Sequence, residues 1–320
     1  MRGYLLRRAA TSVILVIALS IVIFLFLHII YPRPGRDVLG ISAPPAQVAA
    51  WNHQNGFDAS VAVQYWRYAW KLLHGNLGYS YKLNQPVSAL FARRWARSLY
   101  LSGSSLLLAV LITIPLGIFQ AVRSSGLADR VLTGLELVLY ATPAYVLYIV
   151  AIQVFAFTVP VFGYQASQST SLLTVMADWR DMALPIGCLA LLIVAAFSRY
   201  MRSAAIDTLA HDYIKVVRAK GLPERLVLTR HLLRNACPPM ITLLGLSVPA
   251  LLAGNVIVEQ VFNYGGGLGI LFMSSLHSVD YPVLLAYTLV GGVLTILGNL
   301  LADITLTCAD PRLRLTSPRL

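Results

Sequence analysis

The chain has 320 residues, of which 58% are hydrophobic and 12% are charged, and its mean hydropathy is +0.71. These values exclude an ordinary soluble domain, in which about a quarter of the residues are charged, and they indicate an integral membrane protein. The formal net charge of +12 would suggest a nucleic-acid partner in a soluble protein. In a membrane protein it is explained by basic residues that gather in cytoplasmic loops, so we expect no nucleic-acid binding.

The N-terminal segment, MRGYLLRR followed by an apolar run, is expected to remain on the chain as its first span. The run is longer than the apolar region of a signal peptide, and PRPG follows where a cleavage site needs small residues. Six runs have roughly the 20 residues needed to cross a bilayer, which predicts an all-α membrane protein with both termini on one side. The six runs cover residues 9–31, 98–122, 131–158, 183–201, 240–262 and 283–307.

Basic residues predict the orientation. Eight of them lie between Arg199 and Arg234, and placing these inside puts both termini in the cytoplasm. The expected domains are the N-terminal tail and first span at 1–31, an external loop at 32–97, a five-span core at 98–307 with a cytoplasmic coupling loop at 204–236, and a C-terminal tail at 308–320.

The external loop is rich enough in aromatic side chains to pack. Its residues Val61 to Asn76 have the pattern of an amphipathic helix, and Gly75 is placed to end it as a C′ glycine. Such a helix can lie on lipid headgroups with its aromatic side down, or it can form a landing surface for an external partner. Both interpretations remain open.

Ionisable residues within the runs are few, and Glu136, Glu259 and Asp303 all lie nearer to helix ends than to the bilayer centre. A carrier coupled to protons or ions normally buries charges near the midplane, so this distribution argues against secondary transport. No catalytic residues and no metal ligands are predicted. Four prolines within the runs suit either static packing or a gate; they are Pro115, Pro143, Pro185 and Pro249. The three cysteines are interpreted as small buried hydrophobic residues; they are Cys188, Cys237 and Cys308.

The most informative segment is DYIKVVRAKGLPERLVLTRHLLRNA, residues 212–236, which we call the docking segment. Apolar residues recur at intervals of three and four up to Lys220, which predicts one helix that continues beyond the fourth span. Gly221 breaks that helix, and Pro223 suits the N1 position of a second one. A polar helix-turn-helix between two spans indicates a docking site for a soluble partner. The alternative is a solvated basic loop that contacts lipid headgroups.

The docking segment resembles the coupling loop of bacterial ATP-binding cassette (ABC) importer permeases, specifically the dipeptide and oligopeptide permease family, in its acidic residue, its Tyr and its RAKGL. It departs from the family pattern at Lys215, Val216 and Val217, which affects packing size more than the corner. The residues implied in ATPase coupling are Asp212, Tyr213, Arg218, Ala219, Lys220, Gly221, Leu222, Glu224 and Arg225.

The resemblance extends over nearly the whole chain, in the family's order. The matching segments are MRGYLLRR, GNLGYS, PVSAL, YATPAYVLYIV, EQVFNYGGGLG, DYP, NLLAD and DPR. One departure is a run of three glycines where the family has a proline and glycine pair, which predicts a more flexible turn. The residues implied in an external gate or a binding-protein contact are Glu259, Phe262, Gly265, Gly266, Gly267 and Asp280.

The family implies a type I ABC importer permease in the bacterial plasma (inner) membrane. Its expected partners are a second homologous permease, two ATPase subunits, an extracytoplasmic substrate-binding protein and membrane lipids. The sequence has no GxxxxGK[ST] phosphate loop, so we expect no enzyme site and no cofactor in this chain, with ATP and magnesium held by the ATPases. Peptides are the expected substrate, with nickel chelates, glutathione and glycosides as alternatives. Other classes are a stand-alone secondary carrier or channel and a non-transport scaffold.

Overall fold

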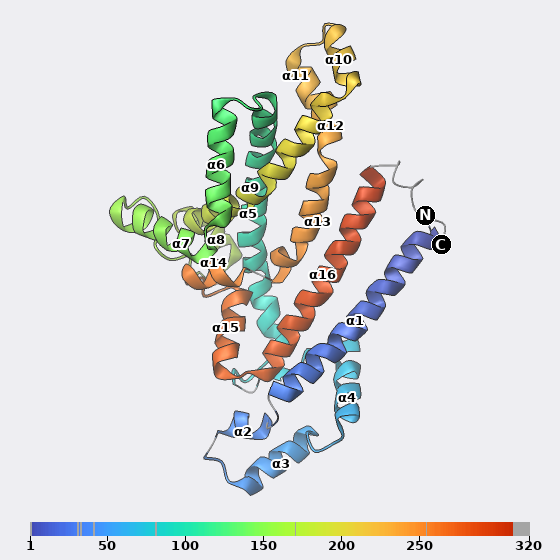
Figure 1. Cartoon of the computed structure of the whole chain (residues 1–320). Coiled ribbons are helices and arrows are strands. Elements are labelled where there is room, and N and C mark those ends of the chain that lie inside the picture. Colours follow the sequence, from blue (N-terminus) through green and yellow to red (C-terminus); the bar gives the residue numbers. More distant parts are fainter. Residues whose placement is uncertain are drawn as a thin grey trace.

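The computed structural model describes residues 2–30, 32, 34–40, 42–80, 82–169, 171–253 and 255–309, and the side chains of residues 2–9, 27, 34, 37, 248–253 and 302–309 lie outside that description. Most of the described chain is helical, in an elongated arrangement (Figure 1). The docking segment lies at one end and α2 and α3 lie at the other. The first residue of α1 and the last of α16 both lie toward the docking-segment end.

The elements follow one another as helices with one short hairpin between them. They are α1 (Arg2–Ile30), α2 (Pro34–Leu39), α3 (Pro45–Asn55), α4 (Val61–Leu73), β1 (Tyr79–Ser80), β2 (Gln85–Pro86), α5 (Val87–Val122), α6 (Leu127–Ala141), α7 (Ala144–Ile152), the π-helical η1 (Gln153–Thr158), α8 (Leu172–Ala177), α9 (Trp179–Ala210), α10 (Asp212–Ala219), α11 (Glu224–Leu226), the π-helical η2 (Val227–Leu232), α12 (Leu233–Ala236), α13 (Pro238–Ala253), α14 (Val256–Val261), α15 (Leu268–Ser278) and α16 (Tyr281–Ala309). β1 and β2 are antiparallel, with Tyr79 opposite Pro86.

Long apolar helices confirm the expected all-α membrane fold. Among the described residues, four segments are long and apolar enough to cross a membrane, and a fifth candidate is the bent pair formed by residues 127–141 and 144–158. The four segments are Ala10–Ile30, Val87–Val122, Trp179–Ala210 and Tyr281–Leu301. Each of the six predicted runs falls on helix, but the third and the fifth are interrupted.

The third predicted span is not one helix, because the chain turns by 103° between α6 and α7. Thr142 is extended, with φ −76° and ψ 127°, and Pro143 follows it as the N-cap of α7. A proline disfavours helical geometry in the residue before it, which ends α6 at this point. Pro115 and Pro185, by contrast, lie inside α5 and α9, which continue through them.

The fifth predicted span is also divided. α13 ends at Ala253, and Asn255 is extended, with φ −99° and ψ 92°, directly before α14. The Asn255 side chain donates a hydrogen bond from Nδ2 to Oγ of Ser102 on α5, over 2.9 Å. The break therefore ties the start of α14 to a neighbouring span.

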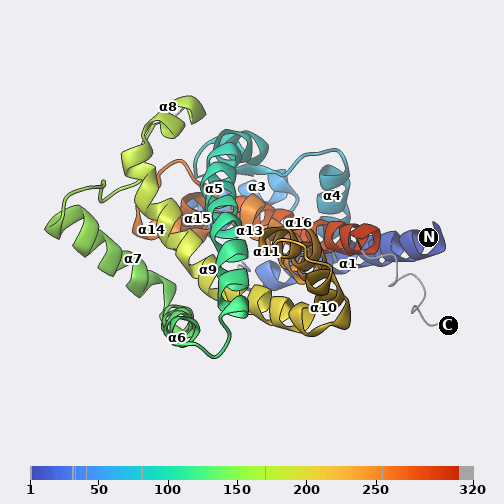
Figure 2. The same cartoon turned by 90° about the horizontal axis from the view of Figure 1, so that it is seen from above.

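The helices pack in two groups that meet along α5 and α13. α5 runs along α9, and α6 packs on α9, whereas α1 and α13 both pack on α16 (Figure 2). α4 is held against α1 and α16 by a cluster of buried and half-buried side chains that includes Ile23, Tyr68 and Leu285. The predicted amphipathic helix in the external loop is confirmed as α4, and Gly75 follows its end with φ +73°, as a C′ glycine does.

Candidate functional site

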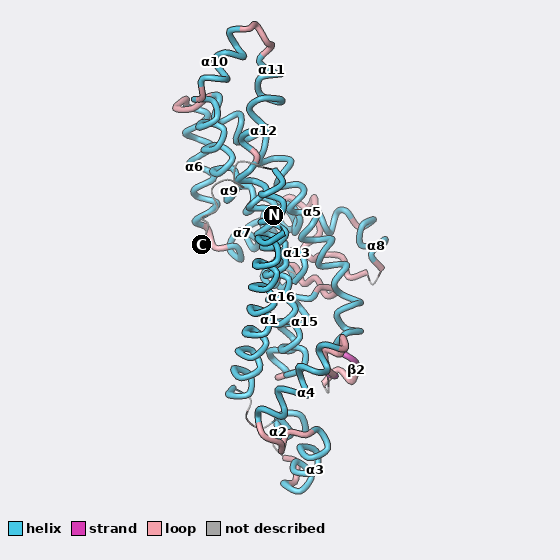
Figure 3. Tube along the Cα trace, turned by 90° about the vertical axis from the view of Figure 1, so that its right-hand side faces the viewer, coloured by secondary structure: helices cyan, strands magenta, loops and turns pink. Residues whose placement is uncertain are grey.

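The docking segment projects beyond the ends of the other helices (Figures 1 and 3). It consists of α10, a corner at residues 220–223, and the continuous helical stretch α11, η2 and α12. The docking segment connects α9 to α13, and it extends away from the bundle that these helices belong to. Its corner is the part of the segment that is farthest from the external loop.

α10 is not a continuation of α9, which corrects the prediction of one long helix. His211 has φ −69° and ψ 140°, so the chain is extended for one residue between Ala210 and Asp212. Asp212 then begins α10, where a negative charge is favourable to the helix dipole. α10 buries Ile214 completely, on the side that faces the rest of the protein. This burial explains why the apolar period of the sequence continues across the break.

The corner is closed by an ion pair between α10 and α11. Arg218 donates from Nη2 to Oε1 of Glu224 over 2.5 Å and from Nε to Oε2 over 3.2 Å. Gly221 has φ +76°, which a glycine adopts without strain. Pro223 is the N-cap of α11 and not its first helical residue, because its ψ of 139° is extended.

Tyr213 joins the two arms of the docking segment. Its hydroxyl accepts a hydrogen bond from Nδ2 of Asn235 over 2.9 Å, and the same Nδ2 lies 2.7 Å from the carbonyl oxygen of His231. Below these contacts, Leu232 and Ala236 are fully buried in a cluster with side chains of α5 and α9. The arms are therefore anchored to the spans by buried side chains, while Lys220, Gly221 and Pro223 of the corner are exposed.

Most of the predicted contact residues lie at or beside this corner, whereas Asp212 and Tyr213 lie at the far end of α10. Ala219, Lys220, Gly221 and Arg225 are exposed, and Leu222 is half-buried. Among the described residues, Asp212 pairs with Lys215 on α10, whereas no ion pair joins Lys220 or Arg225 to a described carboxylate. The corner thus presents positive charge and small side chains to the surroundings, a combination that suits a close contact with another protein.

Glu259 is the centre of a second, buried network at the other end of the spans. Ser98 of α5 donates to its Oε1 over 2.6 Å, and the backbone N–H of Gly269 donates to its Oε2 over 2.7 Å. The N–H of Leu268 in turn donates to Oγ of Ser98 over 2.8 Å. The carboxylate therefore satisfies the N-terminus of α15, which has unpaired backbone donors and a positive dipole end.

The predicted glycine turn lies against this network. None of Gly265, Gly266 and Gly267 has a positive φ. Gly267 is buried beside Glu259, and a Cβ built on it would lie 1.9 Å from the carboxylate. Close approach, more than unusual backbone geometry, thus explains glycine at this position; the flexibility expected of the turn stays a prediction.

Asp280 is buried at the N-terminus of α16 and accepts a hydrogen bond from the hydroxyl of Ser80 on β1. Burial raises the pKa of the Asp280 carboxyl, and the Ser80 hydrogen bond opposes that rise.

Phe262, another predicted gate residue, is fully buried, and its carbonyl oxygen accepts a hydrogen bond from the N–H of Ala166. Glu259 and Asp280 lie beyond opposite ends of α15, whose eleven residues span about 16 Å, so the predicted gate residues form two separate sites.

An ion pair that the sequence does not predict joins α6 and α9, with Asp129 buried and Arg202 half-buried. Arg202 donates from Nε and Nη2 to the two carboxylate oxygens of Asp129, each over 2.7 Å. From the sequence, Arg199, Arg202 or Arg312 is the expected partner of Asp303 and Asp310, and no sequence signal pairs Arg202 with Asp129. Asp303 was noted near the end of the last span, but its side chain lies outside the described residues.

The family model of the binding-protein-dependent transport system inner membrane component matches residues 113–315, and the model of the N-terminal part of such membrane components matches residues 1–102. Together the two matches cover most of the chain.

Curated relatives match over almost their full length. A glutathione transport system permease protein of Salmonella paratyphi A is 34% identical over 315 residues, which cover 98% of this chain and 99% of the relative. A putative peptide permease protein of Brucella ovis is 32% identical over 328 residues, which cover 99% and 100%. The chain belongs to the family of inner-membrane components of binding-protein-dependent transport systems, as a multi-pass permease subunit of an ABC importer.

Proposed function

We propose that this chain forms, with a second homologous permease, the path by which a small peptide crosses the inner membrane. Two ATPase subunits and an external substrate-binding protein complete the proposed complex. The relatives that are named as a peptide permease and as glutathione permeases support this substrate class, since glutathione is itself a tripeptide. Glutathione is the second candidate substrate because those relatives carry its name.

The observation that carries the coupling proposal is the shape of the docking segment. Its two arms are anchored by Tyr213 and by buried Leu232, and its corner is exposed and positively charged. In the proposal, an ATPase surface grips the corner, and closure of the ATPase pair moves the anchored arms. The spans then pass from an inward-open to an outward-open state, because the two states bind ATP with different affinity.

The substrate test is reconstitution of the importer with its binding protein in proteoliposomes. We expect a dipeptide or oligopeptide to raise ATP hydrolysis and to enter the liposomes, and unlabelled glutathione to compete only if it shares the site. Uptake of glutathione with no response to any peptide would contradict the peptide proposal. Uptake that continues without ATP would contradict coupling through the docking segment.

We further propose that the docking segment and both termini face the cytoplasm. The eight basic residues from Arg199 to Arg234 support this orientation, since such residues are retained on the cytoplasmic side.

The orientation predicts the labelling of two exposed positions, Asn55 and Arg225. In a cysteine-free background, a cysteine at position 55 is expected to react with a membrane-impermeant thiol reagent on intact cells. A cysteine at position 225 is expected to react only after the cells are opened. The reverse pattern would invert the topology.

A further inference from the structure

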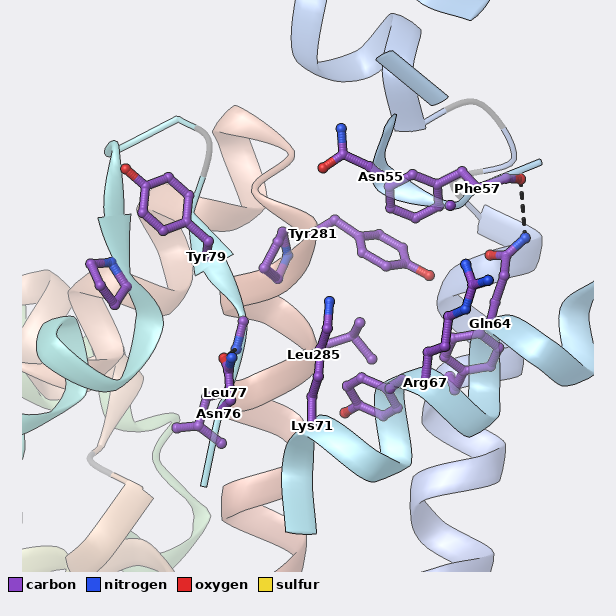
Figure 4. A pocket seen from close by; sticks show the side chains of 16 residues that line it. Asn55, Phe57, Gln64, Arg67, Lys71, Asn76, Leu77, Tyr79, Tyr281 and Leu285 are labelled. Atoms are coloured by element: carbon purple, nitrogen blue, oxygen red, sulfur yellow. Dashed lines mark hydrogen bonds between the residues drawn. The ribbon is translucent and has the colours of Figure 1, made fainter. Parts of the chain in front are cut away.

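A cavity of about 360 Å³ lies between α4, the turn after α3, the β1–β2 hairpin and the first turns of α16. It is at the external-loop end, away from the docking segment and from the Glu259 network. Its sixteen lining residues include two cations, Arg67 and Lys71, and no Asp or Glu. In Figure 4 both cations extend from α4 toward the same space, with the side chain of Tyr281 beside them.

The two cations are available to a ligand. No ion pair joins Arg67 or Lys71 to a described carboxylate. The guanidinium of Arg67 lies so close to Gly56 that a Cβ built on that glycine would be 2.5 Å from Nη1. The hydroxyl of Tyr68, another lining residue, is buried and has no hydrogen-bond partner among the described residues. The cavity therefore offers two cationic donors to an anion, and the Tyr68 hydroxyl lies beneath its lining.

The position of α4 assigns this anion to the membrane. Oγ of Ser20 lies 2.8 Å from the hydroxyl of Tyr65, and the ring of Phe24 contacts the rings of Tyr65 and Tyr68. Ser20 and Phe24 are inside the apolar segment Ala10–Ile30 of α1, and Phe24 is about 9 Å from its end. α4 thus lies beside a span at the depth of the headgroups and the upper acyl chains.

The surface of α4 matches the two parts of a phospholipid. Trp66, Trp70 and Leu73 are 68%, 57% and 81% exposed, and their spacing places them on one side of the helix. Arg67 and Lys71 lie between that apolar side and the side that packs on α1. Exposed Trp at an interface and basic side chains that reach toward phosphate are typical of a helix lying in the headgroup layer.

We propose that this cavity binds the phosphate of an anionic phospholipid from the leaflet next to the external loop, with the acyl chains along Trp66 and Trp70. Arg67 and Lys71 supply the donors. The bound lipid joins α4 to the first turns of α16, because both elements line the cavity. Zwitterionic lipid has a weaker attraction to the site, since its headgroup carries no net negative charge.

The test measures lipid retention by the purified importer complex in native mass spectrometry, with phosphatidylglycerol or phosphatidylcholine added. The Arg67→Gln/Lys71→Gln variant is expected to retain phosphatidylglycerol at least about tenfold more weakly than the wild type. Retention of phosphatidylcholine is expected to be equal in the two. The single variant Lys71→Gln is expected to show an intermediate loss of about fivefold.

The matched control is Arg36→Gln/Arg93→Gln, which removes the same charge from the external-loop end without touching the cavity. It is expected to retain phosphatidylglycerol as the wild type does, and an equal loss in both double variants would overturn the proposal. Thermal stabilisation of the wild type by inorganic phosphate alone, lost in Arg67→Gln/Lys71→Gln, would assign the site to free phosphate. A loss of binding-protein affinity with unchanged lipid retention would assign it to a protein contact.

Discussion

Replacement of Gly221 by tryptophan is expected to abolish uptake while the chain still inserts in the membrane. Gly221 is exposed with φ +76°, and nothing in the described structure lies within 4 Å of a Cβ built on it. The Cβ of the tryptophan therefore contacts no described atom of the docking segment. The indole extends into the space where the partner must bind, and it is expected to clash with the partner. We expect uptake to fall about thirtyfold or more, as for loss of an interface hot spot.

The control for this variant is Gly221→Asn. Asparagine tolerates a left-handed backbone better than other non-glycine residues, so it separates backbone strain from bulk at the interface. It is expected to keep most of the uptake and ATPase copurification. The measurements are membrane level, ATPase copurification and uptake; normal assembly and normal uptake in Gly221→Trp would remove the docking assignment.

Replacement of Arg202 by methionine is expected to lower the stability of the permease by about 1 to 3 kcal/mol, because the buried Asp129 carboxylate loses its half-buried cationic partner. Asp129 is almost fully buried and receives two hydrogen bonds from Arg202. Among the described residues, the Ser125 N–H, at 2.9 Å, and the more distant Thr133 hydroxyl would still donate to its carboxylate. The measurement is denaturation of the purified complex in detergent, monitored as the fraction of protein that remains folded.

The double variant Arg202→Met/Asp129→Leu tests whether the loss comes from the unpaired carboxylate. Removing both charges is expected to restore most of the stability, because a packed apolar pair can replace a buried ion pair. If the double variant is instead as unstable as the sum of the single variants, the two side chains are energetically independent and the ion-pair explanation is wrong.

Local features of the chain were predictable from the sequence. Hydrophobic periodicity located the long helices, and Gly75 and Gly221 marked the ends of α4 and α10 because a left-handed residue is needed there. Pro143 predicts a disturbance of the helix, but a proline alone does not distinguish a kink from the 103° turn that divides the third span. The break at His211 has no proline or glycine to announce it, so the apolar period was extended through it.

Contacts between distant segments were not predictable. Ser98 and Glu259 are 161 residues apart, and Ser80 and Asp280 are 200 apart. Periodicity shows which side of a helix is buried, but it does not show which helix covers that side. Sequence resemblance singled out Glu259 and Asp280 as a group, whereas the structure places them in separate networks on either side of α15.

The attachment of α4 and β1 to α16 has a consequence for the order in which the protein is made. A ribosome completes the external loop long before it reaches Asp280 and Leu285, the residues of α16 and its N-terminus against which Ser80 and Tyr68 pack. During synthesis, α1 and α4 are therefore complete before the neighbour that finally covers them has been made. A chain that stops before residue 280 leaves the inner face of α4 open to proteases, so the last helix completes the folding of one of the first segments to emerge.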